Sequence, residues 1–121
     1  MSEPEKIGII LGNIPNEWID NLKRLVATHD DLELVAETVD QLQLLVLAKE
    51  HNADAIVLSR LPDGREPGIC SHLLTHCPNI LLLLLPLEPG PGLVLRNRPS
   101  REELHDLSIN ALLAVLRRVE G

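Results

Sequence analysis

The sequence predicts an α/β protein built around a mostly parallel β-sheet. Short apolar runs alternate along the chain with longer segments in which apolar residues recur at helical spacing. A short apolar run bounded by turn residues is typical of a strand buried on both faces, and alternating strands and helices form parallel βαβ units. The clearest such run lies at residues 54–58, between a polar turn and the sequence Leu-Pro-Asp-Gly. We expect it to be the central strand.

Size and composition limit the possible functions. The 121 residues suffice for one domain with a hydrophobic core, so we expect a single domain over residues 1–121. A net charge of −7 and a single aromatic residue, Trp18, argue against a nucleic-acid-binding surface. The longest apolar run, residues 80–85, is far below the ~20 residues of a membrane span, and no signal peptide is visible. We expect a soluble cytoplasmic protein with no nucleic-acid or membrane partner.

The first half of the chain predicts two strands and two helices. A buried strand at residues 6–11 precedes a helix over residues 15–28, which Asn13 or Asn16 caps. Residues 32–39 form an edge strand, because their first half alternates between apolar and polar residues. Asp40 is the expected N-cap of a helix over residues 41–51.

The second half predicts a short helix at residues 69–76, buried strands at residues 80–85 and 93–96, and a last helix. Ser100 and Glu103 have the spacing of a capping box for this last helix, which ends near Val119. Only seven residues, 86–92, separate the last two strands. Because a parallel crossover usually needs a dozen or more residues, the helix expected there is missing. The last strand then either pairs antiparallel or crosses by a bare loop. Five strands predict the flavodoxin-like order 2-1-3-4-5.

Several segments, in this order, resemble parts of the receiver domains of bacterial response regulators. Residues 29–37 (HDDLELVAE) resemble the entry into the second strand, and residues 52–58 (NADAIVL) resemble the third strand. Residues 61–64 (LPDG) are similar to the turn after that strand. Arg98-Pro99 with residues 100–104 resembles the Lys-Pro step into the final helix of the family. The resemblance covers most of the chain.

Receiver domains carry a phosphorylated Asp at the end of strand three and an acidic pair at the end of strand one that helps to bind Mg²⁺. A Thr or Ser after strand four and a Lys after strand five contact the phosphoryl group. Mg²⁺ prefers carboxylate oxygens, and an acyl phosphate requires a carboxylate nucleophile. This chain has neither at those positions, so the resemblance implies a degenerate receiver with no metal, no cofactor and no enzymatic activity. The corresponding residues are Gly12 and Asn13 after strand one, Leu58 or Ser59 after strand three, Pro86 after strand four and Arg98 after strand five.

Three other groups of residues are weaker candidates for a site. Cys70, His72, His76 and Cys77 follow a C-x-H-x₃-H-C pattern, but helical spacing puts the cysteines and the histidines on opposite sides. We expect buried cysteines and solvated histidines, with a weak His72/His76 surface site as the alternative. Ser59 lacks both a placed His–acid partner and a G-x-S-x-G motif. Three arginines near the last helix form either a solvated basic edge or a contact for an anion or acidic partner; they are Arg96, Arg98 and Arg101.

The function that the sequence favours is therefore a non-phosphorylatable, receiver-like signalling module that acts by protein–protein interaction. We expect a homodimer formed through the last strand and last helix, because the missing helix would leave sheet surface open and the last helix has surplus apolar residues. The residues of this expected surface are Leu93, Leu95, Ile109 and Leu113. The alternative is a sensor that binds a small ligand or anion at the strand carboxyl ends, near Gly12, Ser59 and Arg98.

Overall fold

The computed structural model describes residues 6–97 and 100–119. In this part of the chain six strands form one sheet in the order β2-β1-β3-β4-β5-β6, accompanied by four helices. Strands β1 to β4 run parallel, whereas β5 is antiparallel to β4 and β6 is antiparallel to β5. The fold is α/β with a mostly parallel sheet, as predicted, but with six strands instead of five. The elements are β1 (Ile7–Leu11), α1 (Asn16–Ala27), β2 (Leu32–Glu37), α2 (Gln41–His51), β3 (Ala55–Ser59), α3 (Ile69–His76), β4 (Leu81–Leu85), β5 (Gly92–Arg96), β6 (Ser100–Leu104) and α4 (Ile109–Leu116).

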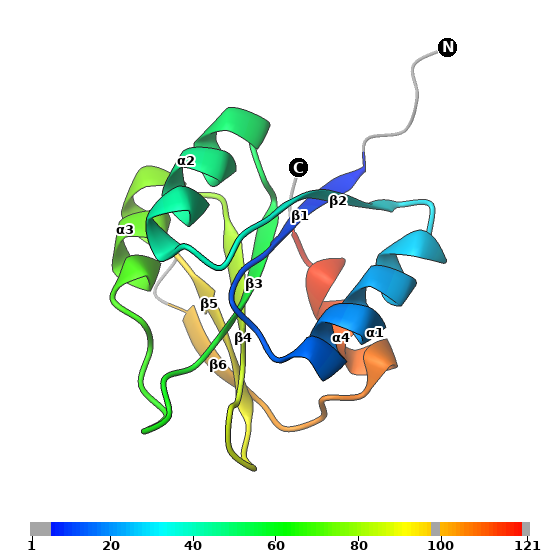
Figure 1. The fold of residues 1–121 in the computed structure, drawn as a ribbon, viewed down its shortest axis with the longest axis vertical. Coiled ribbons are helices and arrows are strands. Elements are labelled where there is room, and N and C mark those ends of the chain that lie inside the picture. The colour runs from blue at the N-terminus through cyan, green and yellow to red at the C-terminus, as the bar shows by residue number, and fades with distance from the viewer. Residues whose placement is uncertain (1–5, 98–99, 120–121) are drawn as a thin grey trace.

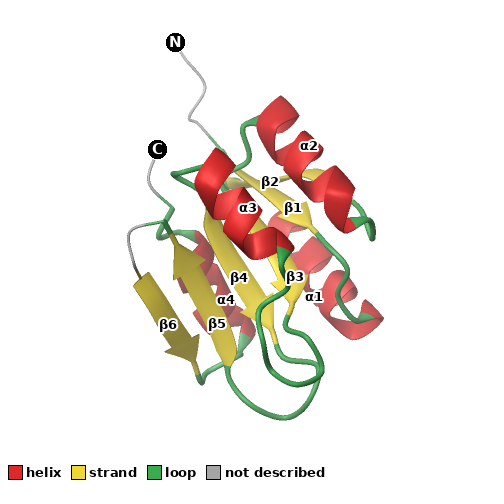
Figure 2. Cartoon of the chain, turned by 90° about the vertical axis from the view of Figure 1, so that its left-hand side faces the viewer, coloured by secondary structure: helices red, strands yellow, loops and turns green. Residues whose placement is uncertain are grey.

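The sheet separates two apolar cores. Helices α1 and α4 cover one face and helices α2 and α3 cover the other (Figures 1 and 2). Alternate residues of each central strand enter opposite cores; Val57 packs with α1 and α4, whereas Ile56 and Leu58 pack with α2 and α3. Burial on both faces explains why β3 and β4 are continuous apolar runs. Among the described residues, no helix is both long and apolar enough to cross a membrane.

Local sequence signals explain the first half of the fold. The Asp40 carboxylate accepts a hydrogen bond from the Leu42 N–H at 2.9 Å, so the expected N-cap of α2 is confirmed. Strand β2 lies at an edge of the sheet, as its alternating pattern predicted. The expected cap of α1 by Asn13 or Asn16 is wrong: the helix follows Pro15 and has no side-chain cap. Proline is compatible with a helix start, because its φ is already near the helical value.

The joint between β4 and β5 is a hairpin loop over residues 86–91 with no helix, as its length predicted. Of the two alternatives for the last predicted strand, the antiparallel pairing is the one observed. However, the expectation that Leu93 and Leu95 lie on open sheet surface is wrong. Their exposed fractions are 0% and 4%, and they share a core with Ile69 and Leu73 of α3. Helix α3 therefore covers the area that the missing helix would have left open.

The predicted last helix is only partly correct, because residues 100–104 form β6 and the helix itself begins at Ile109. The capping-box residues Ser100 and Glu103 lie in this strand, where Glu103 pairs with Leu93 and Ser100 pairs with Arg96. The local helix-capping pattern was overridden because residues 100–104 pair with the edge of β5. The observed cap of α4 is Ser108, whose Oγ accepts a hydrogen bond from the Ala111 N–H at 3.2 Å.

Charged side chains fasten β6 to both faces of the sheet. Arg101 forms an ion pair with Glu66 in the loop before α3, and Glu102 forms one with Arg118 at 2.7 Å, just after α4. As the outermost strand, β6 carries exposed charges at Arg101, Glu102 and Glu103. Charges on an edge strand oppose pairing with a further strand. This edge is thus poorly suited to extending the sheet.

Candidate functional site

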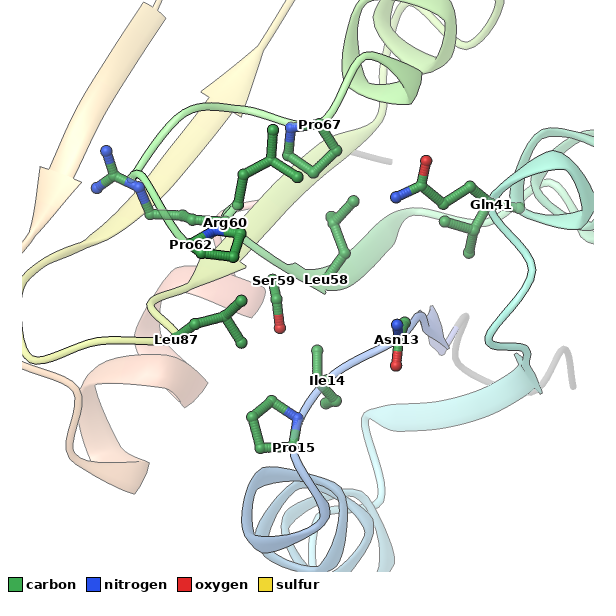
Figure 3. A pocket seen from close by; sticks show the side chains of 12 residues that line it. Asn13, Ile14, Pro15, Gln41, Leu58, Ser59, Arg60, Pro62, Pro67 and Leu87 are labelled. Atoms are coloured by element: carbon green, nitrogen blue, oxygen red, sulfur yellow. The ribbon is translucent and has the colours of Figure 1, made fainter.

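A cleft of about 430 Å³ lies at the carboxyl ends of β1 and β3. Its walls come from the segment before α1, the start of α2, the loop after β3 and the loop after β4 (Figure 3). The carboxyl ends of strands are where open α/β sheets carry their binding sites. The lining residues are Asn13, Ile14, Pro15, Gln41, Leu44, Leu58, Ser59, Arg60, Leu61, Pro62, Pro67 and Leu87.

The lining is largely apolar and includes no carboxylate. Its one ionised side chain, Arg60, is already engaged elsewhere. The Arg60 guanidinium donates from Nε to the Gly64 carbonyl at 2.7 Å and from Nη1 to the Pro91 carbonyl at 3.1 Å. Figure 3 shows the guanidinium directed away from Ser59 and Asn13. The groups left to meet a ligand in the cleft are therefore uncharged.

Ser59 contributes a buried hydroxyl group to the cleft. It is the last residue of β3, where it pairs with Leu85 of β4. Its Oγ is buried and has no hydrogen-bond partner among the described residues. A buried polar group without a partner costs about 1–3 kcal/mol of stability. Figure 3 shows the side chain directed into the space bordered by Leu87, Ile14 and Pro15.

The structure brings half of the sequence-predicted pocket together. Asn13, Leu58 and Ser59 line the cleft. Gly12 is buried beside it, where a Cβ atom would lie 3.3 Å from both the Leu58 Cβ and the Val57 carbonyl oxygen. Pro86 lines an adjoining cleft of about 310 Å³ instead. Arg98 lies outside the described residues.

The sequence did not predict nine of the twelve lining residues, among them Gln41, Leu87 and Arg60. Gln41 enters because α2 begins beside the cleft, and Leu87 enters through the hairpin loop. For Arg60, the sequence indicated only its position directly after the strand. Its contact with the Pro91 carbonyl joins residues 31 positions apart, so no local sequence pattern predicts it.

The surface predicted to form a dimer does not form as one patch. Leu93, Leu95 and Leu113 are buried, with Leu113 in the core opposite to that of Leu93 and Leu95. Ile109 is exposed, at 37%. Apolar side chains are instead exposed on α2 and just before it: Leu42 and Val46, four residues apart and so on one side of the helix, are 77% and 46% exposed, and Val39, before the N-cap, is 76% exposed. We call these three side chains the α2 surface.

Three of the four residues in the cysteine and histidine pattern have the expected burial, and the exception is Cys77. Cys70 is buried, Cys77 is half-buried, and His72 and His76 are exposed. Burial raises the pKa of the Cys70 thiol to about 11, which makes it unreactive at neutral pH. Within the described residues, no three His, Cys, Asp or Glu side chains are grouped as a metal site would require.

Of the three arginines expected to cluster, Arg96 and Arg101 are separated, and Arg98 lies outside the described residues. Arg96 donates to the Arg118 carbonyl at 3.2 Å, near the end of α4. Arg101 pairs with Glu66 on the other side of the sheet. Opposite residues of paired strands point to the same face, and Arg101 pairs with Leu95, the neighbour of Arg96. The two arginines therefore do not build one anion site.

A scan against models of protein families gives no match, and a search of curated proteins gives no significant match.

Proposed function

We propose that this chain is a receiver-like signalling module that acts by associating with another protein chain, in the simplest case a second copy of itself, without phosphotransfer. The observation that carries the proposal is the α2 surface, where Leu42 and Val46 stand outward from a helix whose inner side is already buried. Fully burying one such side chain contributes about 1.5–3 kcal/mol. Exposed apolar patches of this kind are typical of interaction sites.

The receiver-like part of the proposal is supported by strand order and by the position of the cleft. The first five strands follow the order 2-1-3-4-5, and the cleft lies at the carboxyl ends of β1 and β3. The reversed β5 and the added β6 are departures from the flavodoxin-like pattern.

The absence of phosphotransfer is supported by the lining of the cleft. Neither Leu58 nor Ser59 at the end of β3 offers a carboxylate, and the segment that follows β1 supplies Asn13. Without carboxylates the cleft lacks both the nucleophile for an acyl phosphate and the oxygen ligands that Mg²⁺ prefers.

A second copy of the chain is supported as the partner by the charges around the α2 surface. The chain carries a net charge of −7, so two copies repel each other over much of their surface. One turn beyond Val46, however, α2 carries exposed Lys49 and Glu50, one charge of each sign. Counted with Asp40, which is exposed beside Leu42 and caps the N-terminus of α2, these side chains carry a net charge of −1, much less than the −7 of the whole chain. Two such helices meeting about a two-fold axis would therefore bring little like charge together.

Native mass spectrometry tests both parts of this proposal on the purified chain. We expect a dimer whose mass is unchanged after incubation with acetyl phosphate and Mg²⁺. A stable phosphoryl adduct would contradict the absence of phosphotransfer. A monomer alone at micromolar concentration would contradict self-association, so the two parts fail separately.

A further inference from the structure

We propose that the cleft at the carboxyl ends of β1 and β3 binds a small uncharged molecule, consisting of an apolar ring or chain that carries an amide, carbonyl or hydroxyl group. This inference goes beyond self-association and does not depend on it. The volume of about 430 Å³ lies within the range of small-molecule sites, which are mostly apolar with a few polar groups.

The apolar part of the ligand follows from the walls of the cleft. Leu58 and Leu44, which are 3% and 1% exposed, line the cleft together with three prolines and Leu87. Such walls provide contact area without hydrogen-bonding requirements, so they favour an apolar ring or chain.

The polar part of the ligand follows from Ser59. A buried hydroxyl without a partner loses the hydrogen bonds that it would make in water, and a ligand that supplies a partner recovers that free energy. The hydroxyl both donates and accepts, as do the Asn13 and Gln41 amides at the other side of the cleft.

Because Ser59 Oγ is closed off from solvent, a ligand reaches it by displacing a neighbouring side chain. Leu87, which is 44% exposed on the hairpin loop, is the neighbour best placed to move.

The absence of a formal charge on the ligand follows from the electrostatics of the lining. No carboxylate is available to pair with a cation. The guanidinium that would pair with an anion is held by two backbone carbonyls and points away. A charged ligand would lose its hydration in this cleft without gaining a partner.

Three molecules of matched shape test the proposal by two-dimensional NMR titration of the full chain: neutral benzamide, anionic benzoate and cationic benzamidine. We expect saturable shifts with benzamide at the amides of Asn13, Ser59 and Leu87. Benzoate and benzamidine should bind at least about tenfold more weakly.

Two serine variants then test the hydrogen bond. In Ser59→Ala the affinity for benzamide should fall about three- to tenfold, because one hydrogen bond is lost. The same variant should not melt at a lower temperature than the wild type, since it removes an unsatisfied hydroxyl. Ser71→Ala is the matched control, because the Ser71 hydroxyl is exposed on α3 and donates only to the Gly68 carbonyl; the affinity of this variant for benzamide should be unchanged.

Each other outcome overturns the inference. Benzoate or benzamidine binding as tightly as benzamide would show a charged-ligand site. Shifts that map outside the cleft, or no saturable shift with any of the three probes up to their solubility limits, would show that the cleft is not a site. Equal benzamide affinity in Ser59→Ala and wild type would show that the ligand does not bond to Ser59, which contradicts the proposed polar contact.

Discussion

The Arg60 guanidinium reaches the Pro91 carbonyl at 3.1 Å and thereby ties the loop after β3 to the hairpin loop between β4 and β5. A second bond from the same side chain, to the Gly64 carbonyl, closes the first loop on itself. Both loops supply walls of the cleft. Hydrogen bonds from a charged donor are stronger than neutral ones, so this side chain holds the shape of the cleft.

The first prediction concerns this tie. Arg60→Met keeps most of the aliphatic stem but removes all donors, and we expect the free energy of unfolding to fall by about 1–3 kcal/mol. Amide hydrogen exchange in both loops should also accelerate. Arg65→Met is the control, because Arg65 is exposed and pairs only with nearby Asp63; it should change stability by less than about 0.5 kcal/mol. Equal urea midpoints for the two variants would contradict the role of Arg60.

The second prediction concerns the reversal of the chain between β4 and β5. At Gly92 a Cβ atom would lie 2.9 Å from the Leu84 carbonyl oxygen and 3.1 Å from Leu107 Cδ2. Gly92→Ala should therefore lower the free energy of unfolding by about 1–3 kcal/mol, because a backbone oxygen cannot give way. Gly68→Ala is the matched control, since nothing lies within 4 Å of its Cβ position. If urea unfolding finds Gly92→Ala as stable as Gly68→Ala, the close contact between Gly92 and the Leu84 carbonyl oxygen is contradicted.

The third prediction concerns pH. Arg117, just after α4, donates to the Asp31 carboxylate at 2.8 and 3.2 Å, and this bonding lowers the Asp31 pKa below its ordinary value. A lowered folded pKa contributes stability above the unfolded value of about 4, and this contribution is lost as the pH falls through the folded pKa.

Thermal melts of Asp31→Asn across pH values measure this contribution. The variant should melt below wild type at neutral pH, and the gap should close as the pH falls below about 4. Asp30→Asn changes the net charge equally without removing the Arg117 pair. A gap for Asp31→Asn that is constant with pH would contradict the assignment.

The sequence predicted most of the α/β architecture. A continuous apolar strand such as β3 must be covered on both faces, and the segments between the strands supply the helices that cover it. The sequence also predicted the absence of a helix after β4, since chain length alone forbids it. It failed at Ser100 and Glu103, where a local capping pattern was overridden by pairing with β5, a contact decided by the tertiary fold. The apolar pattern of the last helix also misled. Leu113 lies off the core-facing stripe on a helical wheel, but the tertiary fold buries it in the core.

The candidate site was predictable only where it lies on strand ends. Asn13, Leu58 and Ser59 follow from the rule that sites form at strand carboxyl ends. The orientation of Arg60 depends on a carbonyl far away in sequence. The α2 surface went unnoticed because α2 is apolar on several sides, so helical periodicity alone does not say which side the sheet covers.

The most direct measurement of the central claim is sedimentation velocity over a range of micromolar concentrations. It compares the wild type with the double variant Leu42→Glu/Val46→Glu and with Ile109→Glu as control. We expect the wild type to be a dimer and the double variant to be a monomer that circular dichroism shows to be folded. The control should remain a dimer, because Ile109 belongs to α4, which covers the face of the sheet opposite to α2. A wild-type monomer, or a double variant that remains dimeric, would contradict association through the α2 surface.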